Sequence, residues 1–189
     1  PNTHYIDIEL AIQITNENIL SLQLPAWRPG RYELGNFAKN IQKWDAYDGE
    51  GNRLRSKKVT KDRWEVETKG AETVVVKYNY FANELNAGST FLDASQLYIN
   101  GVNCFLYVPN RMDEVCELQL ELPEDYKVAC GLKALGGFAF EAKDFHELVD
   151  CPLVSSDSLK KDTYTVGGTT FYLWFQGECQ PDFDELKKD

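Results

Sequence analysis

Apolar and polar side chains alternate at every second residue along the first part of the chain. Within residues 5–14 the polar positions fall on one face of an extended backbone, and the other face holds Ile6, Ile8, Leu10, Ile12 and Ile14. After a short polar turn, Leu20, Leu22 and Leu24 repeat the same period. Because successive side chains of a strand point to opposite faces, this pattern predicts two half-buried strands.

The same period returns in most later segments. It predicts further strands at residues 41–47, 64–67, 73–81, 115–122, 127–132, 138–142, 163–166 and 169–176. Asn100-Gly101 lies between two apolar runs and predicts a hairpin, because a type I′ turn needs positive φ at both central positions. We therefore expect an all-β fold, a sandwich or saddle of mostly antiparallel strands with one or two short helical turns.

Two capping patterns predict the helical turns. Asp144 is followed three residues later by Glu147, and Pro152 must end that helix soon afterwards. Asp182 and Glu185 repeat the spacing near the C-terminus. We assign residues 1–178 to one β-sandwich domain and interpret residues 179–189 as the start of a linker or helix that leads toward a further domain.

The stretch Pro25–Ile41 predicts an ordered loop, because two prolines fix φ and Gly30 can adopt a positive φ. Such a loop is either a structural corner or a binding surface. Four side chains at loop or strand-end positions are free to meet a partner, namely Trp27, Arg31, Tyr32 and Tyr98. Five other aromatic side chains are predicted to lie in the core, namely Trp64, Tyr78, Tyr80, Phe171 and Phe175.

Composition excludes several classes of function. The 189 residues carry a net charge of −10 with a pI near 4.7, which disfavours binding to nucleic acid or to anionic lipid. No apolar run approaches the ~18 residues that a membrane helix needs. The five cysteines are scattered without a Cys-x-x-Cys pair, so we interpret them as mostly buried thiols. The absence of a signal-peptide pattern favours the cytoplasm, and the missing initiator methionine is consistent with removal of a signal peptide.

The strongest candidate for a metal or catalytic site is the segment from His146 to Asp150. It differs by one residue from the His-Glu-x-x-His zinc motif, in which two histidines share one helical face and the glutamate activates a zinc-bound water. The only other histidine is His4, far away in the sequence. We therefore interpret the segment as a capped turn with an exposed histidine and predict no metal ligands in this chain. No Ser/His/Asp, Cys/His or phosphate-loop pattern is present, so the chain by itself lacks catalytic residues.

Several segments carry a resemblance to a known family. Three stretches resemble the N-terminal domain of the glycyl aminopeptidases. They are the Trp-x-Pro-Gly-x-Tyr core at 27–32, its Asn-Phe-Ala-x-Asn-Ile continuation at 36–41 and the Phe-x-Glu-Leu-x-Asp-x-Pro run at 145–152. These zinc metallopeptidases add a thermolysin-like catalytic domain and then a PDZ domain. The resemblance implies a non-catalytic domain whose partners are its own catalytic and PDZ domains and peptide substrates, with zinc held in the catalytic domain.

In related metallopeptidases of this layout the β domain packs on the catalytic domain and walls one side of the cleft. That analogy makes Asp93, Asn100 and Asn103 candidate substrate-facing residues, because carboxylate and amide oxygens accept hydrogen bonds from an ammonium group. The alternative function is a self-contained binding module for carbohydrate or protein that uses the Trp27 and Tyr32 loop. An exposed apolar patch near the C-terminal end would favour the first function, and an aromatic platform elsewhere the second.

Overall fold

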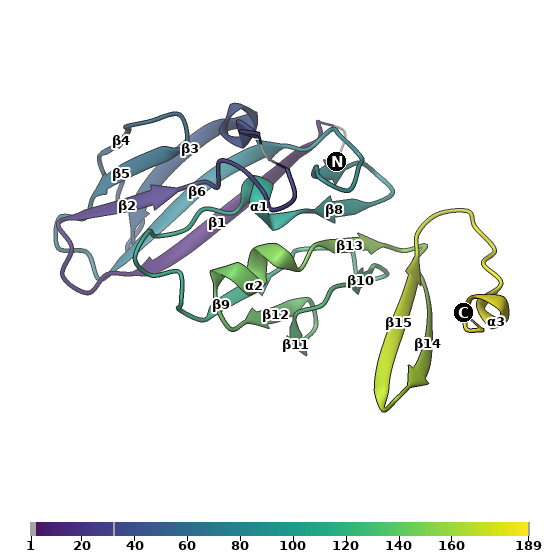
Figure 1. Cartoon of the computed structure of the whole chain (residues 1–189). Coiled ribbons are helices and arrows are strands. Elements are labelled where there is room, and N and C mark those ends of the chain that lie inside the picture. Colours follow the sequence, from purple (N-terminus) through teal and green to yellow (C-terminus); the bar gives the residue numbers. More distant parts are fainter. Residues whose placement is uncertain (1–2, 32, 189) are drawn as a thin grey trace.

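The computed structural model describes residues 3–31 and 33–188 and has an all-β architecture with a few short helical turns (Figure 1). The first half holds β1 (Tyr5–Gln13), β2 (Ile19–Gln23), the 3₁₀ turn η1 (Phe37–Asn40), β3 (Ile41–Asp48), β4 (Ser56–Lys58), β5 (Arg63–Glu67), β6 (Thr73–Phe81), β7 (Phe91–Leu92) and β8 (Leu97–Ile99). The second half holds α1 (Gly101–Cys104), β9 (Cys116–Gln119), β10 (Lys127–Ala129), β11 (Lys133–Gly136), β12 (Ala139–Ala142), α2 (Phe145–Asp150), β13 (Leu153–Ser156), β14 (Lys160–Val166), β15 (Thr169–Phe175) and α3 (Phe183–Leu186).

The first core lies between two three-stranded antiparallel sheets, β1-β6-β3 and β2-β5-β4. The alternating residues predicted to be apolar fill it, including Leu20 and Leu22 from one sheet and Val74 and Val76 from the other, all at most 1% exposed. Trp44 and Trp64 stack across the two sheets with ring centroids 5.8 Å apart. The predicted sandwich is therefore confirmed for this half of the molecule.

The second core continues from the first along the long strands β1 and β6. Tyr80 near the end of β6 packs with residues of the sheet β10-β13-β8-β7 and of the sheet β11-β12-β9. Tyr78, between the two cores, donates a hydrogen bond from its hydroxyl to the carbonyl of Cys104 at 2.7 Å. One pair of strands thus supports both cores and reaches α1.

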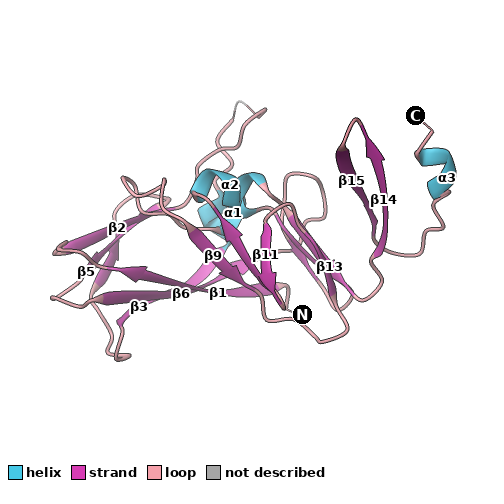
Figure 2. Cartoon of the chain, turned by 90° about the horizontal axis from the view of Figure 1, so that it is seen from below, coloured by secondary structure: helices cyan, strands magenta, loops and turns pink. Residues whose placement is uncertain are grey.

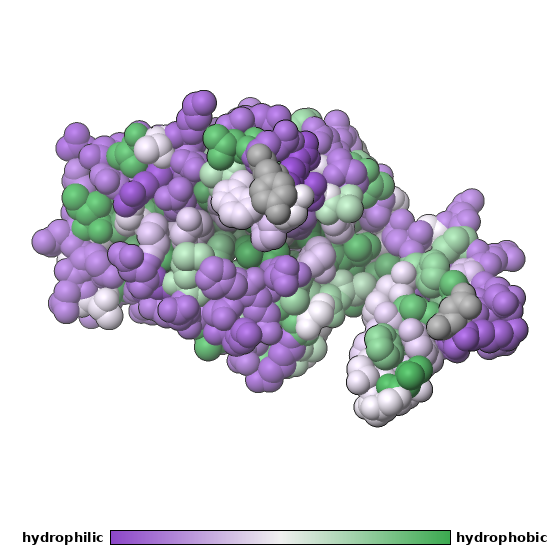
Figure 3. Space-filling view, in the orientation of Figure 1, coloured by the Kyte–Doolittle hydropathy of each residue, from purple (hydrophilic) through white to green (hydrophobic). Residues whose placement is uncertain are grey.

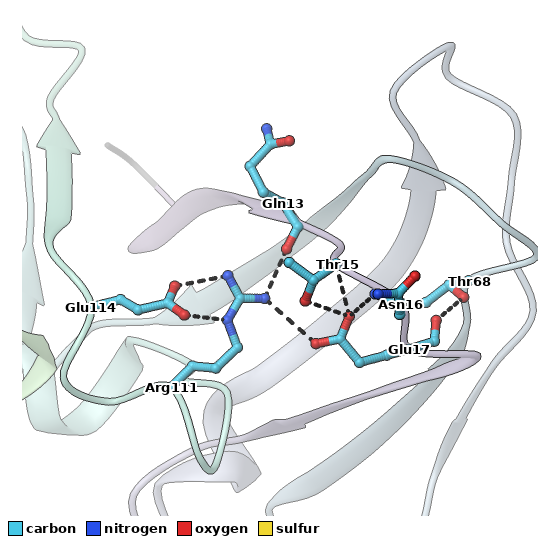
Figure 4. Close-up of polar contacts among 7 residues, drawn as sticks. All are labelled: Gln13, Thr15, Asn16, Glu17, Thr68, Arg111 and Glu114. Atoms are coloured by element: carbon cyan, nitrogen blue, oxygen red, sulfur yellow. Dashed lines mark hydrogen bonds and ion pairs between the residues drawn. The ribbon is translucent and has the colours of Figure 1, made fainter.

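Arg111 fastens the segment before β9 to the turn between β1 and β2 (Figure 4). Its guanidinium donates two hydrogen bonds to Glu114, at 2.6 and 2.7 Å, and one to the carbonyl of Gln13 at 2.7 Å. It also lies 3.9 Å from the carboxylate of Glu17, which accepts hydrogen bonds from the backbone of Thr15 and Asn16. The contact joins residues that are 98 positions apart in the sequence.

The predicted hairpin turn at Asn100-Gly101 is wrong. Asn100 is the N-cap of α1, and its φ of −101° is extended. A Cβ at Gly101 would lie 2.8 Å from the Phe105 ring and 3.2 Å from the Cα of Val149 on α2. The glycine is therefore needed for close packing of α1 against α2 rather than for a positive φ.

Strand pairing in the second half also differs from the prediction. The segments 115–122 and 127–132 contain only the short strands β9 and β10, which pair with β12 and β13 and not with each other. Four short strands, β4, β7, β11 and β13, lie outside the predicted segments. The predicted N-caps are confirmed, since Asp144 accepts a hydrogen bond from the Glu147 amide at 2.7 Å and Asp182 one from the Glu185 amide at 3.0 Å.

The predicted hairpin around Gly167-Gly168 is confirmed, but it projects from the body instead of closing it (Figures 1 and 2). Within the described residues, β14 and β15 form a sheet only with each other. Phe171, predicted to be core, is 44% exposed, because no other sheet lies against its face. Trp64, Tyr78 and Tyr80 are buried as predicted. None of the described helices is long and apolar enough to cross a bilayer.

Candidate functional site

The Pro25–Ile41 segment borders a cavity of about 400 Å³ on one side of the molecule. The opposite walls come from the end of β6, from residues 83–90 and from Asn103 of α1. Gly30 adopts a φ of 82°, which confirms the positive φ predicted for this loop. Figure 2 shows α1 and α2 next to each other on one side of the sheets.

Three side chains hold one short backbone stretch beside the cavity. Tyr98 donates from its hydroxyl to the carbonyl of Ala87 at 3.3 Å, and Asn100 donates from its amide to the same carbonyl at 3.4 Å. Asn103 donates to the carbonyl of Gly88 at 3.0 Å. The structure thus brings together three residues that the sequence marked as candidates, and their donors are used to fix the loop.

Arg28 lies against the same stretch. A Cβ at Gly88 would lie 1.8–2.1 Å from the guanidinium atoms of Arg28, so a side chain at residue 88 would displace that guanidinium. The Arg28 side chain has no hydrogen bond or ion pair with residues 3–31 or 33–188. It also borders a second, more open cavity of about 790 Å³, which is lined by Asn100 and by residues of α2.

Asn103 leaves one polar atom without a partner. The residue is 1% exposed, and its Oδ1 accepts no hydrogen bond from the described residues. A buried acceptor without a donor costs about 1–3 kcal/mol, so such an oxygen favours a ligand or water that can donate. Two acidic side chains also line this cavity: Glu84 accepts a hydrogen bond from the Ser89 hydroxyl at 3.3 Å, and Glu33 pairs with Arg31.

Asp93 lies apart from this cavity, in the turn between β7 and β8. Its Oδ1 accepts hydrogen bonds from the Ser95 amide and hydroxyl, both at 2.8 Å, and from the Gln96 amide at 2.9 Å. Partial burial would raise the pKa of Asp93, but these bonds outweigh it and place the pKa below its ordinary value. The carboxylate is therefore ionised at neutral pH, and its second oxygen accepts no hydrogen bond from the described residues.

The other predicted surface residues differ in their availability. Trp27 is 52% exposed, and Arg31 is exposed but paired with Glu33. Tyr32 lies outside the described residues. Sequence reasoning missed Arg28, Glu84 and Gly88, although Arg28 lies inside the Trp-Arg-Pro-Gly-Arg-Tyr motif.

The segment His146–Asp150 lies in the short helix α2, where His146 is exposed. Glu147 has a structural role there, because its carboxylate accepts a hydrogen bond from the Lys143 amide at 2.6 Å. In the part of the chain that the structure describes, no group of three or more His, Cys, Asp or Glu residues could hold a metal ion.

Only one of the cysteines is fully buried. Burial raises the pKa of the Cys104 thiol far above its ordinary value. Cys116, Cys130, Cys151 and Cys179 are half-buried, so the prediction of mostly buried thiols is wrong. Partial burial also raises the thiol pKa of Cys116, Cys130 and Cys151, which disfavours a nucleophilic role for these three.

Comparisons with known proteins give a match to a family model and matches to solved structures. The sequence model of the Peptidase M61 N-terminal domain matches residues 1–157. The crystal structure of an aminopeptidase N family protein from Idiomarina loihiensis is similar to this chain, with 29% sequence identity and a TM-score of 0.91. That match covers 98% of this chain and 32% of the other, so the chain spans about a third of that protein's length. A comparison with curated proteins finds no match.

Proposed function

Because the chain belongs to the family of Peptidase M61 N-terminal domains, which confirms the resemblance to the glycyl aminopeptidases, we propose that it packs on a zinc-dependent catalytic domain and shapes its peptide cleft. The proposal assigns zinc, peptide hydrolysis and a PDZ domain to the rest of the full-length protein. When bound there, zinc supplies the activation of water for attack on the peptide bond. This chain contributes walls and polar groups to the cleft.

The observation that carries the cleft proposal is the buried, unpartnered oxygen of Asn103, a residue that lines the cavity beside the family motif. An aminopeptidase substrate ends in an ammonium group, which has three donors and no acceptor. An amide oxygen and a nearby carboxylate complement such a group. Asn103 and Glu84 are therefore the substrate-facing pair that we favour, and Asn100 acts by holding the loop that both adjoin.

Asp93 belongs to the proposal as a second, more distant acidic group. It lines neither described cavity, so its effect on an ammonium group would come through charge rather than through direct contact. The effect of its charge is screened over a distance of about 8–10 Å at moderate salt. We therefore expect the contribution of Asp93 to substrate binding to be smaller than that of Glu84.

The test is a kinetic comparison of Glu84→Gln and Asp93→Asn in the full-length protein, with an unblocked peptide as substrate. Both changes remove a charge and keep the shape and an acceptor oxygen. We expect Glu84→Gln to raise KM by roughly threefold to tenfold, with a smaller change in kcat, because one charge-assisted hydrogen bond to the ammonium is weakened. Asp93→Asn should raise KM less and show a stronger dependence on salt.

Asp48→Asn is the matched control. Asp48 also accepts hydrogen bonds through its Oδ1 from two backbone amides of a turn, those of Glu50 and Asn52. It lies at the end of β3, outside the lining of both cavities. Equal kinetics for all three variants and the unchanged protein would remove the cleft-facing role from this domain.

A further inference from the structure

The hairpin β14–β15 and the helix α3 form a small unit of their own beside the body. The two strands pair along their whole length, from Lys160 opposite Phe175 to Val166 opposite Thr169. Helix α3 packs on one end of this hairpin: the rings of Phe175 and Phe183 meet edge to face at 5.5 Å, and Lys187 forms an ion pair with Asp162 at 2.5 Å. Figures 1 and 2 show this unit set apart from the sheets of the body.

The other end of that hairpin face is uncovered. Tyr164 and Phe171 stack across the strands with centroids 5.0 Å apart. Phe171 is 44% exposed, and Val166 at the tip is 61% exposed. On the opposite face Tyr172 is 59% exposed, with Lys161 above its ring at 4.6 Å. Figure 3 shows apolar side chains gathered on this projecting part of the molecule.

An isolated hairpin with this composition needs a partner. Two strands alone are marginally stable in water, and a third strand or a packed layer is needed for independent stability. The edges of the pair also carry unpaired backbone donors and acceptors, which favour addition of a further strand. The uncovered end and the free edges therefore indicate a surface that another piece of polypeptide completes.

Two findings indicate which polypeptide this is. The family match ends at residue 157, before β14 begins, so the hairpin lies beyond the matched N-terminal domain. The match to the solved aminopeptidase covers 98% of this chain, and the uncovered 2% is too short to contain the hairpin. Because the TM-score of that match is 0.91, the hairpin recurs in the solved structure. The match covers only 32% of the solved protein's chain.

We propose that β14, β15 and α3 are the first part of the structural unit that follows the N-terminal domain. In this proposal the polypeptide after residue 189 adds a strand to the hairpin and covers the apolar end formed by Tyr164, Val166 and Phe171. The inference rests on the proposed function, since it requires a following domain, and it names the surface on which that domain is built. It places the boundary between domains at 157–159 instead of at 178.

The junction itself supports this boundary. Leu159 is 3% exposed, and its carbonyl accepts a hydrogen bond from the Lys127 ammonium at 3.3 Å. It is the last residue before β14 and is fixed to the body, whereas β14 begins the projecting hairpin. A rigid anchor followed at once by a separate unit is the arrangement that a domain junction needs.

The test is hydrogen–deuterium exchange of the 189-residue chain and of the full-length protein under the same conditions. We expect amides of residues 161–175 to exchange at least 100-fold more slowly in the full-length protein, while amides of β6 are protected in both. Equal protection in the two proteins would overturn the proposal. Protection that rises with the concentration of the 189-residue chain would overturn it as well, because a second copy would then be the occupant.

The valines at 166 and 115 provide a matched pair of variants, because they are 61% and 62% exposed in this chain. Val166→Lys should leave the 189-residue chain unchanged and speed exchange of the hairpin in the full-length protein at least tenfold. Val115→Lys should change neither. The same response from both variants would contradict the proposal.

These outcomes are separable from the proposed function. A full-length protein that is inactive on peptides but protects the hairpin would remove the peptidase role and keep this inference. An active protein with an unprotected hairpin would keep the peptidase role and remove this inference.

Discussion

At the scale of single residues, Gly101 shows how one missing side chain decides local structure. Its amide and carbonyl belong to α1, and the carbonyl accepts a hydrogen bond from the Phe105 amide at 2.9 Å. The space that a Cβ would occupy is taken by the Phe105 ring and by the backbone of Val149. Because backbone atoms cannot move aside cheaply, this position links the packing of α1 and α2 to the site.

We predict that Gly101→Ala destabilises the protein by about 1–2 kcal/mol. Alanine gains up to about 1 kcal/mol in helix propensity, but overpacking at a closed site costs about 1–3 kcal/mol, so the steric term wins. Denaturant unfolding measures the difference. Gly49→Ala is the control, because its Cβ would lie 3.5 Å from Thr73 in ordinary contact. A stabilised Gly101→Ala variant would show that α1 and α2 are not tightly packed.

The same position explains why the hairpin prediction failed. An Asn-Gly pair between apolar runs has the local signal of a type I′ turn, and nothing nearby in the sequence opposes it. The contact that overrides it comes from Val149, 48 residues later in the chain. Asp144 and Asp182, in contrast, were predictable as N-caps because each bonds an amide only three residues away.

At the scale of elements, the Arg111 network holds the segment before β9 to the β1–β2 turn (Figure 4). Arg111 is 20% exposed in its side chain, so its hydrogen bonds are partly shielded from water. We expect Arg111→Met to reduce the free energy of unfolding by roughly 1–2 kcal/mol, because the Gln13 carbonyl and two carboxylates lose a charged donor.

The network also predicts how stability changes with pH. Hydrogen bonds from Arg111 lower the pKa of Glu114, and backbone hydrogen bonds lower that of Glu17. A carboxyl whose folded pKa is lowered stabilises the fold above its unfolded pKa, and this contribution is lost as the pH falls through the folded value. Stability should therefore decline below about pH 4.3, the ordinary glutamate pKa.

Glu114→Gln should reduce that decline, and urea unfolding at pH 3–6 measures it. Glu121→Gln serves as the control, because Glu121 is exposed and has no hydrogen bond or ion pair with described residues. Identical pH profiles for the two variants would contradict a role for Arg111 and Glu114 in stability.

Element type was largely readable from the sequence, whereas pairing was readable for the hairpin β14–β15 and not for strands joined by long connections. Strands such as β1, β6 and β15 have long alternating patterns that a local reading finds. The pairing of β9 with β12 and of β10 with β13 depends on contacts between residues 20 or more positions apart. The short strands β4 and β7 have two or three residues each, too few for a period to be visible.

At the scale of the whole molecule, the chain has two packed cores and one projecting unit, the hairpin β14–β15 with α3, whose apolar end is uncovered. The cores hold the end of the 25–41 loop, through Phe37, Ala38 and Ile41, and α1, through Cys104. Asn100, Asn103 and Tyr98 lie within six residues of each other, so their closeness in the fold follows from the sequence. The sequence could not reveal Arg28 over Gly88, since that contact brings together loops 60 residues apart.

The central claim is that this domain serves a peptidase without catalysing by itself. The most direct test is turnover of an unblocked glycyl peptide by the zinc-loaded full-length protein and by the 189-residue chain, measured side by side. We predict hydrolysis by the full-length protein and none by the chain alone. Turnover by the 189-residue chain, or its absence from the zinc-loaded full-length protein, would contradict the account.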